Sequence, residues 1–145
     1  MYKLIAATLI GCLSLTAALA QELAIQPEKD KAVVVFYRKK QFSGAALNFT
    51  IRANGQEICR LSNKRYLIYK TSPGKTEFTT VAGGLNIPDK EKLTLDLQAG
   101  KIYYVQGDMI TRFFTNKMEL SEVTESTAQK NLPEMKPDNC NTAQN

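Results

Sequence analysis

The pattern of apolar and polar positions predicts a series of short strands between residues 31 and 125. AVVVFYR at 32–38 is β-branched and aromatic without a polar break until its last residue, as in a strand buried on both faces. LNFTIRA at 47–53 and KLTLDLQ at 92–98 alternate apolar and polar residues, as strands with one buried face do. Further strand-like runs lie at 56–61, 65–71, 76–82, 101–108 and 117–123.

Turn signals separate these runs. Asn54-Gly55 is a strong hairpin signal, and Pro73-Gly74 fits the central positions of a type II turn. Residues 83–91 form the longest loop and are a candidate contact site. About seven to eight short strands spaced in this way predict an all-β fold, an antiparallel β-sandwich. After the polar lead-in at 21–30 and the sandwich at 31–125, we expect a short helix and polar tail at 126–145.

The first 20 residues have the form of a secretory signal. An apolar run follows the lysine near the start, and Ala18-x-Ala20 supplies the small residues that a signal peptidase needs. Cleavage after Ala20 uses the whole apolar run and is favoured. Cys12, preceded by Leu-Ile-Gly, offers lipid attachment as the alternative. We therefore predict a periplasmic or secreted protein, or one anchored by lipid to the cell envelope.

The two cysteines beyond the signal are Cys59 and Cys140. Because an exported chain enters an oxidising compartment, we predict that they form a disulfide. Alternation places Cys59 on the same strand face as Glu57, so a solvent-facing Glu57 would make Cys59 accessible to a tail cysteine. Two distant cysteines without any histidine do not fill a zinc shell, so no metal is expected.

Familiar catalytic motifs are absent from the sequence. Without histidine there is no Ser-His-Asp triad, and there is neither a glycine-rich phosphate loop nor a Cys-x-x-Cys pair. Ser62 and Ser72 lie close to lysines, but both occupy turn positions where serine is favoured for its local hydrogen bonds. We expect no catalytic residues and no cofactor.

The formal net charge is +5 at pH 7, and the basic residues gather at two places. Arg38, Lys39 and Lys40 form the densest cluster, and Lys64 and Arg65 form a second one beside a turn. These residues are candidates for contact with a polyanion. The competing interpretation is a solvated turn that protects a strand edge from aggregation. Nucleic acid is not an expected partner of an exported chain with this modest charge.

Neighbouring Tyr103 and Tyr104 must point to opposite faces of their strand. One of them is expected at an exposed or edge position, which makes Tyr103 a candidate for partner contact. Packing into the core is the competing interpretation.

A family pattern is carried by Val35-x-Tyr37-Arg38, Phe42-x-Gly44, Asn54-Gly55, Leu61, Tyr66, Pro73-Gly74-Lys75 and Ala99-Gly100-Lys101-x-Tyr103-Tyr104-Val105. Through these motifs the stretch from Val33 to Leu120 resembles a family of small bacterial envelope proteins, often lipoproteins, defined as a domain of unknown function. Its turn motifs also look like PEGA and carboxypeptidase-regulatory-like domains, which implies a transthyretin-like sandwich. The family commonly has proline where this sequence has Lys39, and it gives no catalytic residues to carry over.

These observations predict a single-domain, exported envelope protein that acts without catalysis as a binding or structural module. Its partner would be an envelope protein, a glycan or a lipid surface, with membrane attachment expected if Cys12 is lipid-anchored. A secreted effector or inhibitor acting through a surface loop is the main alternative, and an enzyme with an unfamiliar site is the other.

Overall fold

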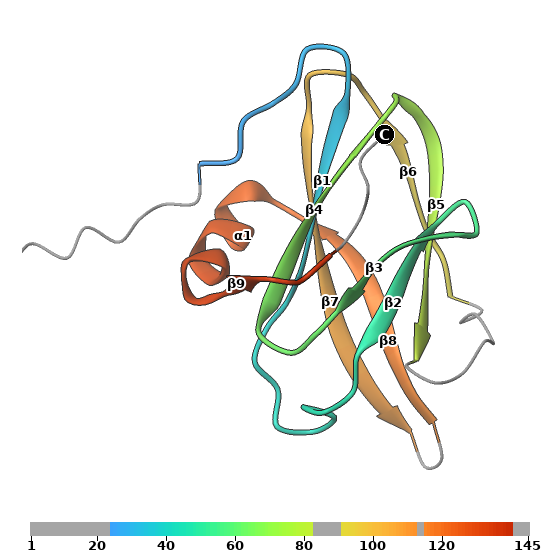
Figure 1. Ribbon diagram of the computed structural model, residues 1–145, viewed down its shortest axis with the longest axis vertical. Coiled ribbons are helices and arrows are strands. Elements are labelled where there is room, and N and C mark those ends of the chain that lie inside the picture. Colours follow the sequence, from blue (N-terminus) through green and yellow to red (C-terminus); the bar gives the residue numbers. More distant parts are fainter. Residues whose placement is uncertain (1–23, 83–90, 113–114, 141–145) are drawn as a thin grey trace, which may run out of the picture.

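The computed structural model describes residues 24–82, 91–112 and 115–140 (Figure 1). The expected signal at 1–20, with Cys12, and most of the loop at 83–91 lie outside the described residues. Within the described ranges the chain forms nine strands, one α-helix and one 3₁₀ helix. The elements are β1 (Ala32–Arg38), β2 (Phe49–Ala53), β3 (Gln56–Leu61), β4 (Arg65–Thr71), β5 (Gly74–Ala82), β6 (Leu93–Leu97), β7 (Ile102–Arg112), β8 (Thr115–Val123), α1 (Glu125–Asn131), η1 (Leu132–Glu134) and β9 (Lys136–Pro137).

The strands make two sheets. A five-stranded sheet has the order β8-β7-β1-β4-β9, and a four-stranded sheet has the order β3-β2-β5-β6. β1 lies at the centre of the larger sheet, antiparallel to β4 and parallel to β7. The predicted all-β class with two sheets is confirmed, and all eight predicted strands are present. The prediction that the strands are antiparallel is wrong for the larger sheet, in which β7 runs parallel to β1 and β9 runs parallel to β4. The transthyretin-like subtype stays a prediction. No helix in the described ranges is long and apolar enough to cross a membrane.

The main core lies between the two sheets. Phe36 of β1 meets Phe78 of β5 edge to face, with ring centroids 5.1 Å apart. Leu95 and Leu97 of β6 enter the same core, as their alternation predicts. The Thr80 hydroxyl also donates to the backbone carbonyl of Met118 at 2.8 Å, so a buried hydrogen bond joins β5 to β8 of the other sheet.

The second face of β1 is covered by the C-terminal helices. Val33, Val35 and Tyr37 pack against Ala128 of α1 and Leu132 of η1. Figure 1 shows α1 beside the five-stranded sheet, so the molecule has three layers. Every residue of β1 is completely buried as a result, which explains why this strand has no polar alternation.

Residues 126–145 were expected to form a short helix and a polar tail, and the structure gives the part that follows α1 a further role. β9 pairs in parallel with the start of β4. The backbone N–H of Asp138 then donates to the Tyr66 carbonyl at 2.8 Å. Two residues are too few to show alternation, and Pro137 is depleted in strands, so the sequence pattern does not predict this ninth strand.

The face assigned to Cys59 was wrong. Glu57 is exposed as expected, but Cys59 is only 7% exposed and belongs to the main core. The register pairs Ile51 with Cys59 and Arg52 with Glu57, so Ile58 is an extra residue in β3. This irregularity is a β-bulge, and a bulge breaks the strict alternation from which the face of Cys59 was derived.

Candidate functional site

Arg38 lies at the end of β1 and is completely buried. Its Nη1 donates to the Leu47 carbonyl at 2.6 Å, and its Nη2 donates to the Gly44 carbonyl at 2.9 Å. The guanidinium carbon also lies 5.3 Å from the centroid of the Phe49 ring. Burial lowers the pKa of Arg38. The prediction that Arg38 contributes to a basic contact surface is therefore wrong, because it faces the core and holds the following loop.

That loop, residues 39–48, joins β1 to β2 and is fixed at several points besides Arg38. The Gln41 backbone N–H donates to Asn63 Oδ1 at 3.0 Å, and Asn63 Nδ2 donates to the Gln41 carbonyl at 3.1 Å. Gln41 Oε1 also accepts from the Met109 backbone N–H at 3.2 Å. These bonds attach the loop to the β3–β4 turn and to β7.

The attachment brings the two predicted basic clusters to one place. Lys39, Lys40 and Lys64 line a pocket of about 200 Å³ whose remaining walls are Asn131, Glu134 and Met135 of the C-terminal segment. We call these six residues the lysine pocket. Within the described residues none of its three lysines forms an ion pair, and Glu134 is the single acid in its lining.

Arg65 and Tyr103 make internal contacts. Arg65 Nη1 donates to the Pro137 carbonyl at 3.2 Å and so supports β9. The Tyr103 hydroxyl accepts from the Gln98 backbone N–H at 2.9 Å and donates to the Asp96 carbonyl at 3.1 Å, which occupies part of the free edge of β6. Tyr104 points to the opposite face, as expected, and is 4% exposed. The arrangement of Tyr103 fits the core-packing interpretation better than partner contact.

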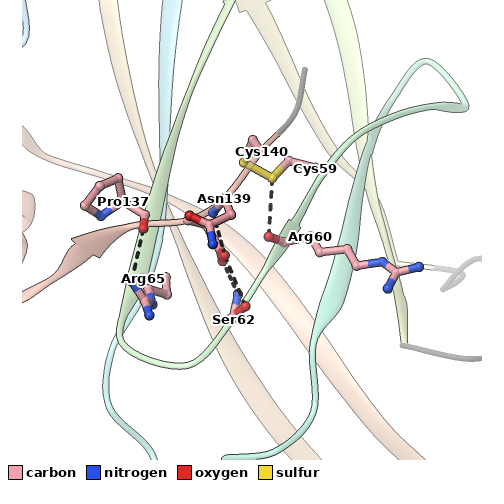
Figure 2. The surroundings of a disulfide bond; sticks show 8 residues. Cys59, Arg60, Ser62, Arg65, Pro137, Asn139 and Cys140 are labelled. Atoms are coloured by element: carbon pink, nitrogen blue, oxygen red, sulfur yellow. Dashed lines mark hydrogen bonds between the residues drawn. A yellow bond between two sulfur atoms is a disulfide. The ribbon is translucent and has the colours of Figure 1, made fainter. Parts of the chain in front are cut away.

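The sequence also singled out the cysteine pair. Cys59 and Cys140 form a disulfide with Cα atoms 5.4 Å apart, across a sequence separation of 81 (Figure 2). The predicted pairing is therefore supported. Beside it, the Ser62 backbone N–H donates to Asp138 Oδ2 at 2.6 Å, and the Ser62 hydroxyl donates to Asp138 Oδ1 at 3.3 Å. Ser62 thus serves to hold the C-terminal segment on β4.

A second pocket of about 220 Å³ lies between the sheets, next to the loop at 83–91. Of that candidate loop the structure describes only Glu91, which is exposed. Lys92 in the lining is paired with Glu77 at 2.8 Å, and the Thr80 hydroxyl is committed to Met118. The remaining lining residues are Leu93, Met118, Glu119 and Leu120. The described residues hold no cluster of three potential metal ligands.

Two features were not found by sequence reasoning. Phe42, which entered only as part of a family motif, is 91% exposed in the loop at 39–48. The wall of the lysine pocket from η1 was also missed, because it depends on how the C-terminal segment packs. The exposure of Phe42 could have been suspected from the sequence, because this aromatic residue stands inside the polar run KKQFSG and outside any predicted strand.

A comparison with protein-family models matches residues 28–119 to a family described as "Protein of unknown function (DUF2846)". The matched stretch contains β1 to β7 and part of β8, including the loop at 39–48. Cys140 and the η1 wall of the lysine pocket lie beyond it. No curated protein matches the chain.

Proposed function

The chain belongs to the DUF2846 family of proteins of unknown function, and we propose that it is an exported protein of the bacterial envelope. In this proposal it acts without catalysis, as a binding or structural module in the periplasm or outside the cell. The sandwich is of the transthyretin-like type, on the strength of the turn motifs it shares with such domains. Its partner is a component of the envelope.

The disulfide is the observation that carries the proposal. Disulfides persist in oxidising compartments and are rare in the cytosol. The bond between Cys59 and Cys140 fastens the last described residue to the smaller sheet, while β9 pairs with the larger one. A structural cross-link of this kind, behind a sequence with the form of a secretory signal, supports export.

The non-catalytic part of the proposal is supported by the sequence and by the places where ionisable groups are perturbed. The chain contains no histidine. Burial raises the pKa of Tyr37 and of Tyr104, and it lowers that of Arg38. None of these three side chains lines either pocket. Tyr37 donates to Gln106 Oε1 at 2.8 Å, so these groups serve the packing of the fold.

The test is the mass of the mature N-terminus in fractionated cells that express the full chain with its own leader. We expect a product that begins at Gln21 in the periplasmic or secreted fraction. A diacylglyceryl group on Cys12 would change the cleavage site but keep the envelope location, and Cys12→Ser would then abolish the lipid attachment. The uncut chain in the cytoplasm would refute the proposal.

A further inference from the structure

Phe42 is an exposed aromatic residue held on a fixed loop. Its side chain is 91% exposed, and it is the one large apolar side chain so exposed among the described residues. The Lys40 ammonium lies 5.5 Å from the centroid of its ring. One residue further along the loop, the Ser43 hydroxyl forms a hydrogen bond of 3.1 Å with the Thr111 hydroxyl. The loop therefore presents this ring to the outside and does not fold it inward.

A lysine next to this ring connects it to the lysine pocket. Lys40 belongs both to the ring contact and to the lysine pocket, where Lys39 and Lys64 join it. Figure 1 shows the β1–β2 connection and the β3–β4 turn at the same lower end of the view. Three lysines against one glutamate leave the lysine pocket with excess positive charge.

We propose that this end of the molecule docks on an anionic phospholipid surface. The lysine pocket receives a headgroup phosphate, and Phe42 enters the boundary between headgroups and acyl chains. An aromatic ring flanked by basic side chains matches both layers of such an interface. The contact needs no lipid on Cys12, and it names the partner class of the proposed envelope module, on which it rests.

A protein partner fits these observations less well. The described surface around Phe42 offers one large exposed apolar side chain, whereas a specific protein interface usually buries a cluster of them. A bilayer can accept a single inserted ring together with several lysine–phosphate contacts. Free phosphate would use the lysine pocket alone and would leave Phe42 in water.

The experiment uses the oxidised mature chain, residues 21–145, which lacks the apolar leader and Cys12, with Phe42→Trp as a reporter. The sequence contains no tryptophan, so the fluorescence of this variant reports on one site. With phosphatidylglycerol vesicles we expect a blue shift and binding that weakens as salt is added. With phosphatidylcholine vesicles we expect no shift.

Charge variants test the contribution of the lysine pocket. Substitution of Lys39, Lys40 and Lys64 by glutamine should weaken partitioning into phosphatidylglycerol vesicles about 100-fold. Each basic side chain near an anionic surface contributes about fivefold, and the three factors multiply. Phe42→Ala should weaken it about tenfold, because one ring no longer leaves water.

The matched control replaces Lys29, Lys31 and Lys101 by glutamine. These three lysines are exposed and lie near the start of β1, where the Val33 backbone N–H donates to the Lys101 carbonyl. Lys39 follows the last residue of β1. Seven residues of strand separate the two sites by roughly 20 Å, beyond the screening length of about 8–10 Å. The control should therefore bind within about threefold of the parent.

Equal losses in the two triple variants, or a fluorescence that phosphatidylglycerol does not change, would overturn the inference. The inference would also be overturned if the protein bound inorganic phosphate while the fluorescence of the Phe42→Trp variant did not respond to vesicles. Binding of an acidic protein, and not of vesicles, would overturn it as well. Because vesicle binding is measured on purified protein, its failure leaves the N-terminal mass in cells as a separate test of export.

Discussion

Breaking the disulfide should cost much of the protein's stability. The perturbation is Cys59→Ala, Cys140→Ala or both, with alanine chosen because Cys59 lies in the core and a polar replacement there would add its own penalty. Any one of the three variants opens the same ring. The cost should therefore appear in each single variant, and the double variant should add little to it.

The magnitude follows from the sequence separation of 81. Cross-linking positions that far apart removes conformational entropy from the unfolded chain worth about 4.5 kcal/mol at 25 °C. Loss of contacts in the folded state adds little to this cost, because β9, the strand next to the bridge, has only two residues. We expect the free energy of unfolding to fall by about 3–5 kcal/mol, a large share of the total for a domain of this size.

Urea denaturation followed by circular dichroism measures this change. With a slope of about 2 kcal/mol per molar urea, the midpoint should fall by about 2 M, and reduction of the parent protein should give the same midpoint. A fall of less than about 1 kcal/mol in all three variants would refute the reasoning, because the bridge would then not restrict the unfolded chain.

Three further predictions concern single side chains. Tyr103→Phe uncovers backbone groups at the β6 edge, so it should cost about 1 kcal/mol in urea denaturation and increase self-association in light scattering. Thr80→Val leaves the buried Met118 carbonyl unpaired and should cost about 1–3 kcal/mol in the same denaturation assay. Burial raises the pKa of Tyr37 above its ordinary 10.0, so the stability it contributes is complete below that pH and is lost as pH rises through the native pKa. Tyr37→Phe should therefore show a smaller fall of the urea midpoint between about pH 9 and pH 11 than the parent.

The regular part of the fold could be predicted from local pattern. β1 has no polar alternation because a sheet covers one face and α1 with η1 covers the other. Asn54 and Gly55 have φ values of 48° and 83°, the left-handed geometry that a tight hairpin turn requires. In these cases the residues that determine the structure are neighbours in the sequence.

The rest depends on contacts between distant residues. Arg38 looks like part of a basic surface run, but carbonyls of the folded-back loop surround it. The bulge at Ile58 reverses the face of Cys59, and no turn residue marks it. The lysine pocket needs η1 beside two turns, an arrangement that is set by the packing of Leu132 on β1.

The most direct test of the account is a non-reducing peptide map of the protein from cells whose free thiols are blocked at lysis. Trypsin should release residues 53–60 joined to residues 131–145, since the bond from Lys136 to Pro137 resists cleavage. We predict that Cys59 and Cys140 are recovered in this linked peptide and carry no blocking group. Recovery of both cysteines as separate blocked peptides would contradict the claim that this sandwich is exported and closed by a disulfide.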